Sequence, residues 1–190
     1  MKIWDVLTGR SSVPPADLDR LFLVPSAAIT LQTAAGFEPT GTGSVCFRAP
    51  SGRAAQQVQD EAVSILGVGD QAPTVEVEHD SFGYTWVVVQ GEGDDMAGLC
   101  TGLHGVNTLL EEQGFGAGLL CTLVGFHDSG GRSFGLVYLY KQSTFYPFAP
   151  SGTDTRDNLL EMSVRDELAG DLPMEEDLQQ WLALWGAPGL

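Results

Sequence analysis

The hydrophobic pattern of the chain predicts strand hairpins separated by single helices. Alternation with a period of two marks "TVEVEH" (74–79), and "GYTWVVVQ" (83–90) is predicted as its hairpin partner. The runs "LLCTLVGF" (119–126) and "SFGLVYLY" (133–140) predict a second hairpin, because the turn-forming residues "HDSGGR" join them. Two earlier β-capable runs, Ala28 to Thr33 and Ser44 to Arg48, have glycines between them and predict a further pair of strands.

Helical spacing of apolar residues predicts the remaining elements. One predicted helix follows Asp94 or Asp95 as its cap and ends at Gly114. Similar patterns predict helices in the segments 1–10, 17–24, 51–67, 155–170 and 174–186. After a short helical preface the order is β-β-α-β-β-α-β-β-α-α. This order predicts an α+β fold with one antiparallel sheet and the helices on one side. We expect residues 1–16 to form a short N-terminal helix and linker, and residues 17–190 to form a single α+β domain.

The net charge limits the kinds of molecule that the protein can bind, and the cysteine content indicates its cellular compartment. The formal net charge is −16, from 9 basic and 25 acidic residues, which argues against nucleic acid as a partner. No apolar run approaches the length of a membrane span, so we expect at most peripheral membrane association. The three cysteines, Cys46, Cys100 and Cys121, lack paired spacing and predict buried, reduced thiols in a cytoplasmic protein.

The stretch "VYLYKQSTFYPFAP" (137–150) places five aromatic residues around one lysine. Its first part alternates as a strand, whereas Pro147 and Pro150 predict an extended segment that leaves the sheet. We favour a role at the core edge, with a binding groove beside it as the alternative. The predicted binding residues are Lys141, Phe145, Tyr146 and Phe148. Within that groove we expect Tyr146 to be exposed. The apolar C-terminal tail, with Trp181 and Trp185, is expected to dock on the domain itself.

Catalytic and metal-binding patterns are weak throughout the chain. Cys100 and His104 share one helix face and could form a nucleophile and base, but apolar neighbours favour an inert thiol. The cysteines together with His104 lack the short ligand spacing typical of zinc sites, and no glycine pattern predicts nucleotide binding. We therefore predict no catalytic residues, no metal site and no cofactor. A thiol-dependent hydrolase using Cys100 and His104 stays open as an alternative, as does a small-molecule-binding regulator.

Several segments together resemble the PspA-associated protein family PspAB, which occurs in actinobacteria and some archaea. The resemblance rests on "LDRLFLVPSAAITLQTAAGFEPTGTGSVCFR", "FGYTWVVV", "LHGVNTLLEEQGFGAGLLCTLVGF", "LVYLYKQSTFYPFAP" and the ending "WLALWGAPGL". It implies a role in the phage-shock type of membrane-stress response, in which the coiled-coil protein PspA coats damaged membrane beside small accessory proteins. The resemblance supplies no catalytic residues.

Together these observations predict a non-enzymatic accessory or adaptor protein that acts by binding other proteins. The expected partner is a PspA-like protein or another component of the membrane-stress system, and the acidic charge favours a basic face on it. Hairpins alternating with helices also resemble small secretion-chaperone folds, which often dimerise. This analogy leaves a homodimer open.

Overall fold

The structure is a computed structural model that describes residues 17–48, 60–61, 64 and 73–190. The predicted N-terminal helix (1–10), the linker up to residue 16 and most of the predicted helix 51–67 lie outside these residues. The domain boundary expected at residue 16 is therefore untested. The described residues form one antiparallel sheet with helices, as the α+β prediction required.

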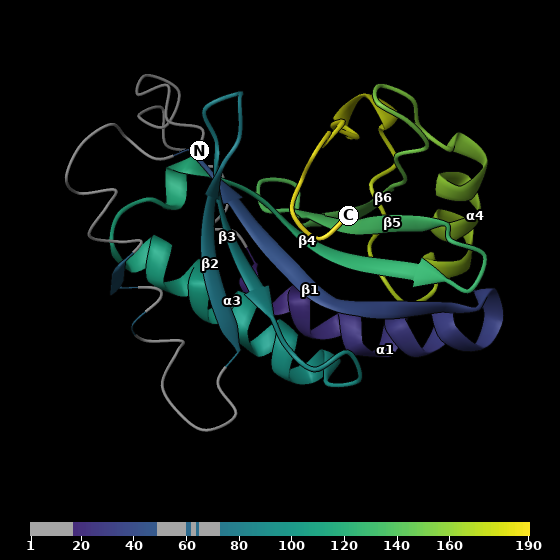
Figure 1. Cartoon of the computed structure of the whole chain (residues 1–190), viewed down its shortest axis with the longest axis horizontal. Helices are drawn as coiled ribbons and strands as arrows, with labels where there is room; N and C mark the ends of the chain where they lie inside the picture. The colour runs from purple at the N-terminus through teal and green to yellow at the C-terminus, as the bar shows by residue number, and fades with distance from the viewer. Residues whose placement is uncertain (1–16, 49–59, 62–63, 65–72) are drawn as a thin grey trace, which may run out of the picture.

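Six antiparallel strands form a single sheet in the order β2-β3-β1-β4-β5-β6. Both predicted hairpins are confirmed, since β2 pairs with β3 and β4 pairs with β5. The long β1 lies between the two hairpins and joins them into one sheet (Figure 1). The strands are β1 (Phe37–Phe47), β2 (Thr74–His79), β3 (Thr85–Gln90), β4 (Leu119–Asp128), β5 (Ser133–Leu139) and β6 (Thr144–Phe148).

Three helices pack on one face of the sheet and bury the larger hydrophobic core. They are α1 (Val24–Thr30), α3 (Met96–Glu112) and α4 (Asn158–Leu168). The side chain of Asp95 caps α3 by accepting a hydrogen bond from the Gly98 backbone N–H at 2.8 Å. Asp157 caps α4 in the same way, with the Leu160 N–H at 3.0 Å. The helices-on-one-side prediction is confirmed for these three elements.

The predicted strand from Ala28 to Thr33 is wrong, because this segment belongs to a helical run. A 3-10 turn (Leu18–Leu23), α1 and a π turn (Leu31–Ala35) follow one another without a break. The buried positions 21, 24, 27, 28 and 31 recur at helical spacing, while Ile29 remains 63% exposed. Packing of that apolar stripe under the sheet outweighs the β-preference of Ile29 and its threonine neighbours. The run ends at Gly36, whose φ of +72° suits a residue without Cβ.

The predicted helix at 174–186 is also wrong. Only the 3-10 turn Leu178–Gln180 is helical there, and the rest of the tail is irregular. The tail begins at the sheet edge, where Pro173 and Glu175 exchange backbone hydrogen bonds with Phe145 of β6 at 2.9 and 2.7 Å. A helix advances only about 1.5 Å per residue, so an irregular chain of the same length can cross more of the sheet.

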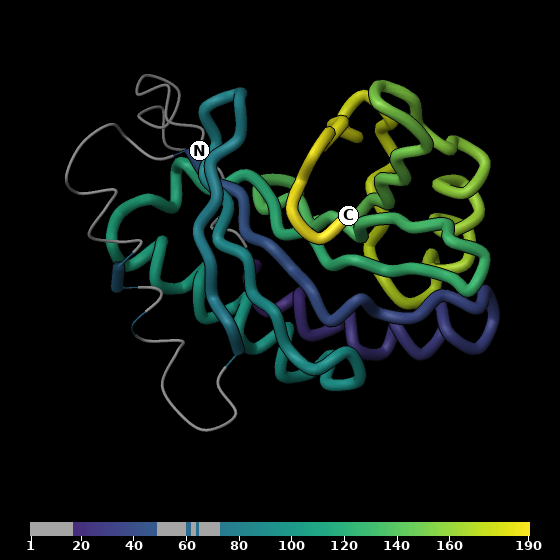
Figure 2. The backbone as a smooth tube through the Cα atoms, viewed as in Figure 1, coloured from purple at the N-terminus to yellow at the C-terminus, as the bar shows by residue number. Residues whose placement is uncertain are grey.

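This C-terminal tail covers the face of the sheet opposite the helices, as Figure 2 shows for the yellow end of the chain. Trp181 and Ala187 are buried in a second hydrophobic cluster on that face, which confirms that the tail docks on its own domain. Gly125 of β4 allows the close approach, because a Cβ there would lie 2.3 Å from the carbonyl oxygen of Gly189. The sheet therefore has two covered faces, one helical and one irregular.

Candidate functional site

The aromatic segment singled out from the sequence becomes the edge strand β6 and is buried. Phe145 faces the helical core and packs on the Tyr138 ring, with ring centroids 4.7 Å apart. Tyr146 and Phe148 face the opposite way, toward Trp181 and Trp185 of the tail. The prediction that the segment leaves the sheet is wrong, because β6 pairs with β5 along Thr144 to Phe148. An edge strand tolerates the missing N–H of a proline.

The expectation of an exposed Tyr146 is wrong as well. Its side chain has no accessible surface, and its hydroxyl donates a hydrogen bond to the carbonyl oxygen of Leu182 at 3.0 Å. Phe145 and Phe148 are 1% and 0% exposed, so of the predicted binding residues Lys141 alone lies on the surface. A binding role for these four residues stays untested. The free domain presents the lysine and keeps the aromatic rings inside.

Cys100 and His104 share α3 but take different partners. Cys100 is fully buried, and its thiol donates to the Met96 sulfur at 3.8 Å. Burial raises the pKa of the Cys100 thiol to about 12, which keeps it protonated at neutral pH. The His104 ring lies 3.1 Å from an Asp19 carboxylate oxygen and 5.0 Å, between centroids, from the Phe22 ring. These contacts link α3 to the first helical run.

Two aspartates at strand ends stabilise hairpin turns: Asp80 directly follows β2, and Asp128 is the last residue of β4. Asp80 accepts backbone hydrogen bonds from Phe82 and Tyr84, and Asp128 accepts them from Gly130 and Arg132, all at 2.9 Å. The hydrogen bonds and the charge of Arg132 hold the pKa of Asp128 below its usual value. Aspartate is favoured at such positions because its side chain can accept hydrogen bonds from backbone N–H groups of the turn. In the described part of the chain, no group of three or more His, Cys, Asp or Glu side chains could hold a metal ion.

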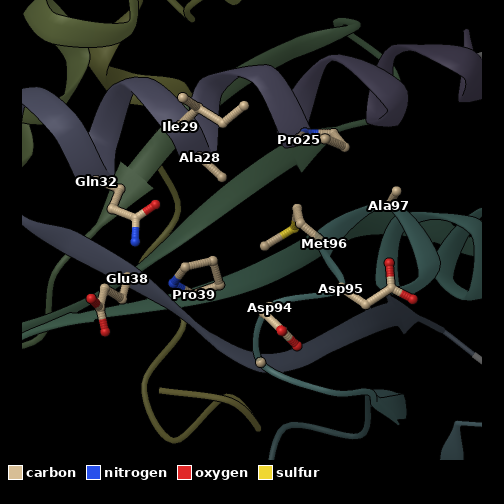
Figure 3. Close-up of a pocket in the computed structure, with 11 residues that line it drawn as sticks. Pro25, Ala28, Ile29, Gln32, Glu38, Pro39, Asp94, Asp95, Met96 and Ala97 are labelled. Carbon is tan, nitrogen blue, oxygen red and sulfur yellow. The ribbon is translucent and has the colours of Figure 1, made fainter.

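An open groove lies on the helical side, between α1, the start of β1 and the first turn of α3 (Figure 3). Its volume is about 550 Å³. The floor is apolar, because Met96, Ala28 and two prolines line it. Met96 and Ala28 are largely buried, with 7% and 5% of their surface exposed. Three carboxylates stand at its rim, and all three residues are exposed. The lining residues are Pro25, Ala28, Ile29, Gln32, Glu38, Pro39, Gly93, Asp94, Asp95, Met96 and Ala97.

The groove exists because β1 is longer than its neighbour β3. The pairing with β3 ends at Thr42, opposite Gln90, so the first residues of β1 pair with β4 alone. Gly41, with φ +75°, bends the strand at this point. A side chain there would be crowded, because its Cβ would lie 3.0 Å from the Cα atom of Gly93. The chain after β3 turns away into α3, which leaves an opening beside the start of β1.

A second concavity lies on the opposite face, between the β2–β3 hairpin and the tail. Its volume is about 460 Å³, within the range typical of small-molecule sites. Cys46 of β1 and Cys121 of β4, which lie opposite each other in the sheet, are part of its apolar lining. The aromatic side chains that line it are Phe82, Tyr84, Trp86 and Trp185. We call this second concavity the aromatic pocket.

Sequence reasoning missed the residues of the groove. Residues 28–33 were predicted as a strand, so the exposed face of α1 was not recognised as a surface. The groove also joins segments that are far apart in the chain, residues 25–39 and 93–97. The available signal was the helical spacing of apolar residues from 21 to 31, which leaves Ile29 on the outside.

The fold and the site define an antiparallel α+β domain with an open, acid-rimmed groove on its helical side. A family model described as PspAB, PspA associated protein B, matches residues 1–189, and the chain belongs to this family. The resemblance found in the sequence is thereby confirmed over the whole chain. A search of curated proteins finds no match, and a search of solved structures finds none either. Among the helices of the described residues, none is long and apolar enough to cross a membrane.

Proposed function

We propose that this chain is a non-enzymatic accessory protein of a PspA-type membrane-stress system, and that it acts by binding a PspA-type protein. The observation that carries the proposal is the family match over residues 1–189, whose name associates the family with PspA. Two features of the domain support it: the protonated, buried thiol of Cys100 and the open groove beside α1. The unpaired state of the three buried cysteines fits the cytoplasm, where thiols stay reduced.

Direct titration of the purified full chain with the PspA-type protein of the same cell tests this proposal. We expect a saturable complex with a Kd of about 10 μM or tighter, measured by calorimetry at physiological salt. Bovine serum albumin, another acidic protein of no relevance to membrane stress, is the control partner. Absence of a complex with the PspA-type protein at the highest soluble concentration would overturn the choice of partner.

A small-molecule regulator is the second candidate, and the aromatic pocket favours it. Its volume and aromatic lining suit an apolar ligand of low molecular mass. Native mass spectrometry of the chain purified from its own cells would distinguish the two functions. A bound small molecule that Trp86→Ala removes supports the regulator, whereas the unliganded mass together with a PspA-type complex supports the accessory protein.

A further inference from the structure

The groove beside α1 has the composition of a protein-docking surface with a defined sign of charge. The floor is built from Ala28 and Met96, and Ile29 adds an apolar side chain at the rim that is 63% exposed. Figure 3 shows the Met96 side chain and the Pro39 ring between α1 and the start of α3. Apolar side chains of a partner would lose water on this floor, which is the main source of favourable free energy in such contacts.

The rim selects the charge of the partner. Glu38 stands on the β1 side, whereas Asp94 and Asp95 stand at the start of α3. Among the described residues, none of those that line the groove carries a positive charge. No lining residue therefore neutralises the carboxylates. A basic segment of a partner is complementary to them in charge. The net charge of −16 adds long-range attraction for the same kind of partner.

A second copy of this chain does not meet these requirements. It would bring 25 acidic and only 9 basic residues toward an acidic rim, so like charges would oppose the contact. An added β-strand fits poorly as well. The edge of β1 that borders the groove contains Pro39, which lacks the N–H that strand addition requires.

A helix fits the shape better than a strand. Two helices, α1 and α3, border the groove, and a third amphipathic helix can present side chains at positions i, i+3 and i+4 to the floor. The same helix can carry lysine or arginine residues on its flanks, within reach of the rim. Long basic side chains combine an apolar stem with a charged end, which matches an apolar floor below carboxylates.

We propose that this groove binds a basic amphipathic helix of the PspA-type partner. The apolar side chains of that helix contact Met96 and Ile29, and its basic side chains pair with Glu38 and Asp94. The choice of partner rests on the proposed function, whereas the position of the groove and the chemistry of the helix rest on the geometry alone.

The test uses two variants of the full chain with the same change in charge. In the groove variant, Glu38→Gln and Asp94→Asn remove two rim carboxylates; in the control variant, Glu111→Gln and Glu112→Gln remove two exposed carboxylates at the far end of α3. All four residues are exposed, so both variants should keep the melting temperature of the unchanged protein. Asp95 is left intact, because it caps α3.

Affinity is measured for the PspA-type protein and for a synthetic 18-residue amphipathic helix of leucine and lysine. We expect the groove variant to bind both probes about tenfold more weakly, since two exposed ion pairs are lost. Ile29→Ser should weaken both complexes by a similar factor, and the control variant should stay within about twofold. A matched helix of leucine and glutamate should not bind.

The possible failures are distinguishable. If the PspA-type protein binds all variants equally, the inference about the groove is overturned while the proposed function stands. If the groove and control variants lose equal affinity, attraction is diffuse and the inference is also overturned. If the PspA-type protein does not bind at all, yet the leucine–lysine helix binds in a groove-dependent way, the partner is wrong and the groove assignment is supported.

Discussion

At the scale of single residues, Asp80 organises the rim of the aromatic pocket. One carboxylate oxygen accepts the Phe82 and Tyr84 backbone N–H groups, and the other accepts the indole N–H of Trp86 at 3.0 Å. Burial by itself raises the pKa of Asp80, but the hydrogen bonds, led by that of Trp86, outweigh it and hold the pKa below its usual value. A carboxylate whose folded-state pKa is lowered stabilises the fold above its unfolded pKa, and this stability is lost as the pH falls through the folded pKa.

We therefore predict that Asp80→Asn reduces the acid sensitivity of the fold. Between about pH 6 and about pH 3 the unchanged protein should lose more free energy of unfolding than the variant. Protonation of the Asp80 carboxylate weakens its hydrogen bonds, whereas the asparagine side chain does not change its protonation state. Urea unfolding at a series of pH values measures the difference. Asp94→Asn, at an exposed position, is the control and should keep the acid sensitivity of the unchanged protein. Parallel pH profiles for all three proteins would contradict the role of Asp80.

The thiols give a second residue-scale prediction. A hydrogen bond to the Cys121 thiol, followed by burial, raises the pKa of Cys46, and burial raises that of Cys100 to about 12. Because the thiolate is the reactive form and all three cysteines are buried, a thiol reagent at about pH 7.5 should modify none of them in the folded protein. All three should react after unfolding, which mass spectrometry can count. Fast labelling of Cys100 in the folded chain would instead favour the thiol-dependent hydrolase.

At the scale of elements, one ion pair joins α4, β6 and the tail. Arg156 donates to both carboxylate oxygens of Glu161 at 2.8 and 3.1 Å, and to the Trp181 carbonyl oxygen at 2.8 Å. Glu161, which is 1% exposed, also accepts the Ala149 backbone N–H that follows β6. The Arg156 guanidinium lies 5.0 Å from the Phe148 ring centroid. The irregular tail is thus attached to a helix and a strand by a buried charge, in addition to its apolar contacts.

For the strand β6 we predict that Tyr146→Ala destabilises the domain by about 3 to 5 kcal/mol. The ring stacks on Trp181 with centroids 5.7 Å apart, and truncation would leave a cavity between strand and tail. Chemical unfolding measures the loss, and Lys141→Ala, at an exposed position, should change stability by less than about 0.5 kcal/mol. If Tyr146→Ala keeps normal stability but loses affinity for the partner, this prediction is contradicted. Tyr146 would then belong to an exposed binding surface, as the sequence predicted.

At the scale of the whole molecule, charge dominates the behaviour of the domain. Acidic residues exceed basic ones by 16, and mutual repulsion among them opposes the compact state. The same field favours basic partners and slows the approach of acidic ones. A homodimer through the groove is disfavoured on this ground. A homodimer through another surface stays a prediction that the single chain does not test.

We predict that the melting temperature rises as sodium chloride is increased from about 10 mM to about 150 mM. Screening shortens the Debye length from about 30 Å to about 8 Å, which weakens repulsion between the exposed carboxylates. Thermal unfolding followed by circular dichroism at constant pH measures the shift. The Glu111→Gln, Glu112→Gln variant should respond less steeply, since it carries two fewer negative charges. A melting temperature that falls with salt would show that attractive ion pairs outweigh repulsion.

The sequence by itself determined the elements whose pattern is local. The two hairpins and the helices α3 and α4 follow from period-two and helical spacing, from the aspartate caps and from the turn residues between the strands. The faces of β5 were also predictable, since Tyr138 points to the helical core and Val137 to the other cluster. Such features depend on neighbours within a few residues, so the chain alone specifies them.

Only the tertiary structure decided the roles of α1, β6, the tail and the groove. Segment 28–33 is helical because its apolar stripe packs under the sheet, and 174–186 is irregular because Trp181 and Ala187 reach across the second face. Tyr146 is buried because the tail returns to cover it from 35 residues further along the chain, where Trp181 stacks on its ring. The groove likewise joins residues 25–39 to 93–97. Burial and concave shape depend on contacts between distant segments, and local propensity is too weak to specify them.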